Sequence, residues 1–293
     1  MNMRGNNLKE LYIITKYHSF FISVLYFAWK IYFKLLQLIS KSGISKSIVN
    51  KLNAISETLF LVSHQVSVKN LDVISINDVK YMIRPNTSDF AVLNQIVLQK
   101  SYNSLVNSYK RSFGNKPKII YDLGANVGYS TVYFSHEFGN ECIIKCFEPF
   151  HSNFKILEEN IKDIENIFAF NNAVWNETSY LKFDRNFRDN KEWSIVITEG
   201  KTTDYDIIGL NLSELINSEE VVDILKIDIE GSEKRLFSNE EYSQSFLSKV
   251  KCICIEIHDE FECRPTIYNH LSTSGFIFYD NADLTIGINK NYL

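Results

Sequence analysis

The strand–turn–helix stretch at residues 118–128, KIIYDLGANVG, constrains the fold of this 293-residue chain more than any other segment. Its apolar first half predicts a short strand with Asp122 at the carboxyl end. Gly124 and Gly128 then bracket a tight turn, and a helical pattern follows over residues 129–138. In open α/β sheets, ligands bind outside the carboxyl ends of the strands, and a glycine turn lets a ligand approach the backbone. The stretch therefore predicts a nucleotide-type site.

Strand-like and helical segments alternate through the rest of the chain. Apolar, strand-like runs occur at residues 142–147, 167–170, 180–183, 193–198, 223–229, 249–257, 276–279 and 284–288. Helical patterns lie between them at residues 152–161, 212–216, 232–237 and 266–274. Strands spaced by helices indicate a mostly parallel sheet covered on both faces, which is a doubly wound α/β fold.

The N-terminal part of the chain differs from this pattern. Residues 1–64 read as a helical extension, and we expect the main domain to span residues 65–293. Residues 66–83 are strand-like on either side of a turn at 77–78, which predicts a hairpin. This hairpin and a helix behind it form the segment 65–115 that leads into the glycine turn.

Residues 20–39, FFISVLYFAWKIYFKLLQLI, are strongly apolar but contain Lys30, Lys34 and Gln37. A membrane-spanning helix takes about 20 mostly apolar residues with few or no charges. A signal peptide would start with a basic region and end in small residues, and no Ala-x-Ala occurs here. Aromatic residues and lysines on one helix also suit a membrane surface. A membrane-surface or partner-docking helix, a packed helix of the domain and a true span all stay open.

Charge and cysteine content narrow the cellular context. A net charge of −4 provides no basic field, so a nucleic acid is not expected as a partner. The five cysteines include no C-x-x-C pair, and four lie in apolar runs. This usage indicates buried free thiols in a reducing compartment. We expect a cytoplasmic protein, peripheral at the inner membrane face if residues 20–39 bind there.

The glycine turn departs from the dinucleotide fingerprint G-x-G-x-x-G. Asn126 stands where the middle glycine would admit a pyrophosphate, and Asp122 would place a negative charge near the phosphates. A cofactor without phosphates and with a cationic part suits these residues better. S-adenosylmethionine has both properties, whereas NAD has phosphates, so we predict S-adenosylmethionine as the cofactor.

Two later segments would complete this cofactor site. Glu148 follows Gly128 by twenty residues and ends the next strand in Phe-Glu-Pro. An acid there can accept hydrogen bonds from both ribose hydroxyls, as it also does in NAD sites. Asn172 and Ala173 lie just beyond the third strand, where the adenine would lie. An Asn-Asn pair such as 171–172 is by itself also typical of a turn.

The segment 225–233, LKIDIEGSE, brings carboxylates to the end of a central strand. Asp228 is expected near the reactive end of the cofactor, and Glu230 has the same side-chain parity. Such a pair suggests charge compensation for a sulfonium, metal binding or proton handling. Glu233 reads as an acid in the first turn of a helix.

The segment 252–258, CICIEIH, places Glu256 and His258 on one face of a strand. An acid and a histidine at the carboxyl end of a strand are typical of a general base with the group that orients it. We therefore expect this pair near the acids of the preceding strand.

Four motifs together resemble the FkbM-type methyltransferases: D-x-GAN-x-G at 122–128, FEP at 147–149, LKIDIEG-x-E at 225–233 and EIH at 256–258. The segment RPNTSDFAVLNQI at 84–96 is also similar to members found in glycan gene clusters. The resemblance covers roughly residues 80–260.

The resemblance implies a Rossmann-like class I methyltransferase fold with a seven-stranded sheet, S-adenosylmethionine as donor, and a hydroxyl acceptor. The residues expected to bind the cofactor are Asp122, Gly124, Ala125, Asn126, Gly128, Glu148, Asn172, Ala173 and Asp228.

From what the resemblance implies, we expect O-methylation of a hydroxyl, on a sugar of a glycan or glycolipid. His258 would act as general base, assisted by Glu256 and Glu230. A divalent cation held by Asp228, Glu230 and Glu256 could instead lower the pKa of the hydroxyl. Two other functions compete: a non-catalytic docking protein with the same fold, and an NAD-dependent sugar oxidoreductase, which Asn126 and Asp122 disfavour.

Overall fold

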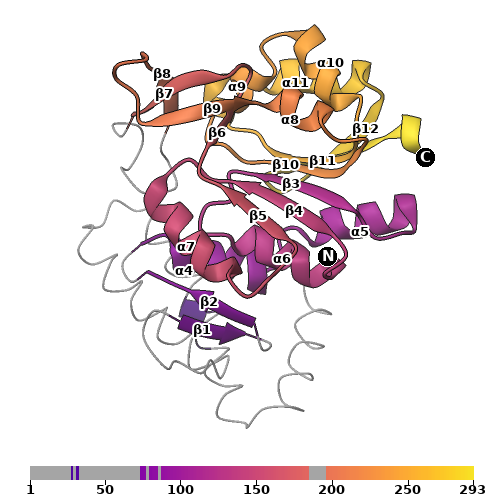
Figure 1. Ribbon diagram of the computed structural model, residues 1–293. Helices are drawn as coiled ribbons and strands as arrows, with labels where there is room; N and C mark the ends of the chain where they lie inside the picture. Colours follow the sequence, from indigo (N-terminus) through magenta and orange to yellow (C-terminus); the bar gives the residue numbers. More distant parts are fainter. Residues whose placement is uncertain (1–27, 29–30, 33–72, 77–78, 85–86, 185–195) are drawn as a thin grey trace. The chain divides into compact units, whose positions relative to one another are not determined.

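The computed structural model describes residues 28, 31–32, 73–76, 79–84, 87–184 and 196–293 (Figure 1). The chain divides into two compact units, residues 1–85 and 86–293. Nearly all of the expected segment 20–39, and the expected boundary at residues 64–65, lie outside the described residues. Among the residues described, no helix has the length and apolar character needed to cross a membrane.

In the first unit, the described residues contain a hairpin. Strand β1 (Val73–Ile76) pairs antiparallel with β2 (Val79–Met82), and Ile76 lies opposite Val79. The predicted hairpin is confirmed over these two strands.

The second unit is built on a seven-stranded sheet of order β12-β13-β11-β10-β3-β4-β5. Its strands are β3 (Ile119–Leu123), β4 (Ile143–Phe147), β5 (Ile167–Phe170), β10 (Val222–Ile227), β11 (Val250–Glu256), β12 (Phe276–Asn281) and β13 (Leu284–Asn289). The five strands from β11 to β5 run parallel, and β13 is antiparallel to both of its neighbours. The predicted mostly parallel, seven-stranded sheet is confirmed.

Helices cover both faces of this sheet (Figure 1). On one side lie α4 (Asp89–Leu93), which continues as the π-helix η1 (Asn94–Leu98), together with α5 (Asn103–Phe113), α6 (Tyr129–Phe138) and α7 (His151–Ile161). On the other side lie α8 (Leu212–Asn217), α9 (Glu233–Leu236), α10 (Glu240–Leu247) and α11 (Arg264–Thr273). The short 3₁₀ helices η2 (Asp259–Phe261) and η3 (Lys290–Tyr292) follow β11 and β13.

A second, four-stranded sheet of order β6-β9-β7-β8 was not expected. It contains β6 (Ala173–Trp175), β7 (Ser179–Asp184), β8 (Val196–Glu199) and β9 (Ile207–Asn211). Its own small core holds Ala173, Trp175 and Leu181. The sequence indicated β7 and β8, but β6 has only three residues and β9 runs directly into α8, so neither gives a periodic signal.

Asp223 links several elements at the amino end of β10. This is the opposite end of the sheet from the glycine turn. Its carboxylate accepts hydrogen bonds from the Tyr109 hydroxyl (2.8 Å), the amides of Lys118 (2.8 Å) and Ile119 (3.1 Å), and the Lys251 ammonium (2.8 Å). Burial alone would raise the pKa of Asp223, but these donors outweigh it and lower the pKa.

Gly124 is required by the close approach of two loops. Its φ of +74° lies in the left-handed region, and a Cβ at this position would lie 1.7 Å from the carbonyl oxygen of Asp228. Gly114, which ends α5 with a φ of +68°, has no atom within 4 Å of the same position. The two glycines thus share a conformation but differ in the space around them.

We expect Gly114→Ala to cost about 1 kcal/mol of unfolding free energy, since only the left-handed backbone is penalised. Gly124→Ala should cost roughly 3 kcal/mol more, because the methyl group overlaps a backbone oxygen. Urea denaturation of both variants measures the difference. Equal losses would show that the loop after β10 can move away without cost.

Candidate active site

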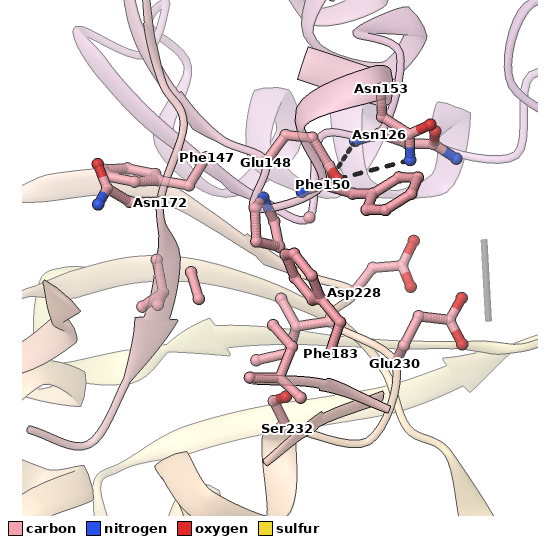
Figure 2. A pocket seen from close by; sticks show the side chains of 16 residues that line it. Asn126, Phe147, Glu148, Phe150, Asn153, Asn172, Phe183, Asp228, Glu230 and Ser232 are labelled. Carbon is pink, nitrogen blue, oxygen red and sulfur yellow. Dashed lines mark hydrogen bonds between the residues drawn. The ribbon is translucent and has the colours of Figure 1, made fainter. Parts of the chain in front are cut away.

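The carboxyl ends of β3, β4 and β10 meet at one pocket, and the second sheet forms part of its wall (Figure 2). Of the residues expected at the site, those lining this pocket are Gly124, Asn126, Glu148, Asn172, Ala173, Asp228 and Glu230. The sequence analysis did not assign several other lining residues, namely Phe147, Phe150, Asn153, Val174, Phe183 and Ile197. Phe183 and Ile197 come from β7 and β8, whose position over the pocket depends on the unexpected sheet.

Ala125 and Gly128 shape the glycine turn without lining the pocket. The amide of Gly128 donates a hydrogen bond to the carbonyl of Ala125 at 2.8 Å. Gly128 precedes α6 with a φ of +87°, and a Cβ there would lie 3.2 Å from Leu157 Cγ. Between them, Asn126 takes a φ of +51°, a conformation that asparagine adopts more readily than most residues.

Glu148 holds the turn to the start of α7. Its carboxylate accepts hydrogen bonds from the amides of Asn126 and Phe150, both at 2.9 Å, and from the side chain of Asn153 at 3.5 Å (Figure 2). Burial raises the pKa of Glu148 to about 7, although these bonds and the charge of Lys226 act in the opposite direction. Two of these bonds end on Oε1 and one on Oε2, so Oε2 keeps a further lone pair.

Asp122 lies beneath the turn and does not line the pocket. It is fully buried, and its Oδ2 accepts hydrogen bonds from the hydroxyls of Ser130 and Thr131, each at 2.7 Å. Its Oδ1 lies 3.1 Å from the Lys226 ammonium. Asp122 therefore lies outside the pocket lining, and the cofactor contact expected from its place at the strand end stays a prediction.

Lys226, which the sequence analysis did not assign, is the buried cation below the site. Its side chain is 2% exposed and donates hydrogen bonds to the carbonyls of Leu123 (3.2 Å) and Gly124 (2.7 Å). It also lies 3.6 Å from Asp228 Oδ2. Burial disfavours its charge, but Asp122 and Asp228 outweigh burial and raise the pKa of Lys226. A lysine inside the buried run of β10 could have signalled this role.

His258 is held by Glu233 rather than by Glu256. The Nδ1 atom of His258 lies 3.0 Å from Glu233 Oε1, and its Nε2 atom lies 3.4 Å from Glu230 Oε2. Glu233 is fully buried and also accepts a hydrogen bond from the Ile229 amide at 3.0 Å. The first turn of α9 was the expected place for Glu233, but its bond to His258 was not foreseen.

The charges of this group act on one another. Burial would lower the pKa of His258, but the hydrogen bond and charge of Glu233, with Asp228 and Glu230, raise it. The negative charge of Asp228, together with burial, raises the pKa of Glu256 to about 8. Carboxylates are thus concentrated at the carboxyl ends of β10 and β11.

A candidate metal site differs from the expected one in one ligand. Ligand atoms of Asp228, Glu230 and His258 all lie within 4.8 Å of one another. In this group of described residues His258 takes the place expected for Glu256. Glu230 reaches it from a left-handed φ of +52°, followed by Gly231 at +94°.

Comparison with known families identifies the chain. The sequence model of the methyltransferase FkbM domain matches residues 122–278, which is more than half of the chain. The chain belongs to the FkbM methyltransferase family. This match confirms the resemblance that the four motifs indicated. It supports a methyltransferase in general.

Solved structures of methyltransferases resemble the fold. An FkbM methyltransferase from Methylobacillus flagellatus KT is 16% identical and covers 59% of this chain, with a TM-score of 0.41, while this chain covers 43% of that protein. A methyltransferase from Geobacter sulfurreducens is 12% identical over 71% of this chain and 92% of its own, with a TM-score of 0.39. Fibrillarin from Aeropyrum pernix, with natively bound S-adenosyl-L-methionine, is 13% identical over 59% and 66%, with a TM-score of 0.35. None of the curated proteins matches the chain.

Lys226→Met should reduce the free energy of unfolding by roughly 3–5 kcal/mol, because it leaves the buried Asp122 without its cation. Adding Asp122→Asn removes that charge and should recover part of the loss. Chemical denaturation of both single variants and the double variant gives their coupling energy. Additive losses would contradict a direct interaction between the two charges.

Proposed function

We propose that the protein is an S-adenosylmethionine-dependent O-methyltransferase whose acceptor is a hydroxyl of a sugar in a glycan or glycolipid. One observation carries the choice of donor: the described residues lining the pocket include three carboxylic acids, Glu148, Asp228 and Glu230, and no lysine, arginine or histidine. A pyrophosphate would meet no countercharge there, whereas a phosphate-free cationic donor suits this set. Membership of the FkbM family supports the same donor.

The residues of the pocket fit the parts of this donor. Glu148 Oε2 has a lone pair left for a ribose hydroxyl, and the apolar wall of Val174, Phe183 and Ile197 suits an adenine ring. Asp228 and Glu230 would offset the positive charge. When bound, S-adenosylmethionine supplies an activated methyl group on a sulfonium.

We assign the proton of the acceptor hydroxyl to His258. Its Nδ1 is held by Glu233, so its Nε2 is the nitrogen directed to the side of Glu230. Because the carboxylates favour the imidazolium, His258 must release its own proton before it accepts another. The chain contributes mainly orientation, which is the large term when two reactants must align for displacement.

A divalent cation on Asp228, Glu230 and His258 is the second candidate for activating the hydroxyl, supported by the 4.8 Å grouping of their ligand atoms. Carboxylate oxygens suit Mg²⁺ or Mn²⁺, and a bound cation lowers the pKa of a coordinated hydroxyl. Turnover that survives EDTA treatment would exclude this scheme, and turnover restored only by added Mn²⁺ would favour it over the base.

The affinity for S-adenosylmethionine should rise about tenfold between pH 6 and pH 8, because an ionised Glu148 with a pKa of about 7 accepts ribose hydroxyls better than its neutral form. Glu148→Gln should bind S-adenosylmethionine more weakly and lack this rise of affinity with pH. Any pH dependence that comes from titration of the ligand itself should remain. Calorimetry over the pH range compares the two. Identical pH profiles would remove Glu148 from the binding site.

His258→Ala should keep cofactor affinity and lose methyl transfer by about 100-fold or more. His270, the matched control, is equally buried at 6% exposure, and its Nδ1 lies 2.9 Å from the Ser243 hydroxyl in α10. His270→Ala should lower stability and leave turnover of the folded protein unchanged. The readout is S-adenosylhomocysteine formed with a pool of glycan acceptors. Full turnover in His258→Ala would remove the imidazole from the mechanism.

A further inference from the structure

An open cleft adjoins the pocket proposed for the cofactor, and the two share Glu230. We name it the acidic cleft; it is lined by Gln95, Glu230, Glu256, Ile257, His258, Asp259, Glu260, Arg264, Ala282 and Asp283. Its volume of about 530 Å³ is in the range of small-molecule sites. Because His258 lines it and Glu230 borders both spaces, the acidic cleft is where the acceptor would lie if the proposed function is correct.

Half of the lining residues are carboxylic acids, from four different parts of the fold. Glu256 ends β11, Asp259 and Glu260 follow in η2, Asp283 lies in the turn between β12 and β13, and Glu230 comes from the loop after β10. Only two of the described lining residues, His258 and Arg264, can carry a positive charge. Carboxylic acids therefore outnumber basic groups among the described residues of this lining.

The guanidinium of Arg264 is engaged within the protein. Its Nε and Nη2 atoms donate to the two carboxylate oxygens of Asp259 at 2.6 and 2.9 Å. Nη1 donates to the Tyr268 hydroxyl at 3.0 Å, and Nη2 also donates to the Ile257 carbonyl at 3.2 Å. Arginine binds phosphate and carboxylate groups through the same paired N–H donors of its guanidinium, which form a fork. Here the fork is occupied by a carboxylate of the chain.

The imidazole of His258 is likewise compensated, because Glu233 and Glu230 lie 3.0 and 3.4 Å from its two nitrogens. Neither of the two cations that line the cleft therefore offers an uncompensated charge to an anionic ligand. Hydroxyl and ammonium groups, in contrast, can donate hydrogen bonds to the carboxylates and to the amide oxygen of Gln95.

We infer that the acidic cleft selects a neutral or amine-bearing polyhydroxyl acceptor and excludes phosphorylated or carboxylated ones. The inference rests on the proposed methyl transfer and specifies its substrate class. Repulsion by the carboxylates that predominate in the described lining would act on an anionic acceptor both on encounter and in the bound state. Nucleotide-activated sugars, sugar phosphates and uronic acids are the classes that this arrangement disfavours.

Turnover with a matched acceptor set tests the inference directly. The set contains a neutral hexose glycoside, its 2-amino derivative, its 6-phosphate and its uronate, each assayed by S-adenosylhomocysteine formation. The neutral and amino members should exceed the two anionic ones by at least about tenfold in kcat/KM. Equal or greater turnover of an anionic member would overturn the inference and leave the methyltransferase assignment intact.

A second measurement needs no acceptor to be found. Cationic, neutral and anionic nitroxides of matched size broaden the NMR signals of nearby groups according to their local concentration. The His258 imidazole signal, assigned by its loss in His258→Asn, should broaden several-fold more with the cationic probe than with the anionic one. The reverse order would overturn the inference whatever the turnover results.

Two charge-reversal variants complete this measurement. Asp283→Lys, at the exposed turn of the acidic cleft, should reduce the ratio of cationic to anionic broadening. Glu241→Lys makes the same change on the exposed first turn of α10, outside the cleft, and should leave the ratio unchanged. Equal effects of both variants would show that net charge, and not the cleft, sets the preference. If the unmodified protein does not bind S-adenosylmethionine in calorimetry, the proposed function itself is contradicted.

Discussion

The buried ammonium of Lys226 is the interaction on which the site depends. It joins Asp122 at the end of β3 to Asp228 beyond β10, and it donates to the carbonyls of Leu123 and Gly124 between them. A buried charge costs several kcal/mol unless it is paired and hydrogen-bonded. Separation of the two loops would break these pairs and leave buried charges uncompensated. The absence of a side chain at Gly124 then lets the backbone of Asp228 come close. Together these contacts fix the floor of the pocket before any ligand binds.

Above this floor, carboxylic acids outnumber basic groups among the residues that the structure describes. Glu230 and Glu233 leave the end of β10 through a left-handed turn, and both reach His258 at the end of β11. The raised pKa of Glu256 is a consequence, because Asp228 opposes its ionisation. A cationic donor on one side and a hydroxyl-bearing or amine-bearing acceptor on the other would each relieve this excess. The proposed donor and the proposed acceptor class thus follow from one electrostatic property.

Sequence reasoning succeeded where the signal was local. Strand β3, strand β5 and helix α6 were placed correctly because apolar runs and glycines mark their ends. It failed where side chains meet only in the folded chain. The strand period put Glu256 and His258 on one face, but the turn after Gly231 determines that Glu233 reaches the imidazole. Asp122 stands at the strand end as expected, but the sequence did not indicate that two hydroxyls from the first turn of α6 would bind its carboxylate. The second sheet depends on non-local pairing, which short segments do not reveal.

The replacement of a middle glycine by Asn126 has a structural meaning beyond the motif. In dinucleotide sites, amides of such a turn and the helix behind it bind a pyrophosphate. Here the Asn126 amide donates to Glu148 at 2.9 Å, so the chain supplies its own anion to that donor. The carboxylate of Glu148 accepts the hydrogen bond of this amide, and its negative charge repels a phosphate. The same device recurs across the site, where Asp259 occupies the fork of Arg264. In both cases an internal carboxylate takes the donor that an anionic ligand would need, which supports the proposed cationic donor and the proposed hydroxyl-bearing acceptor.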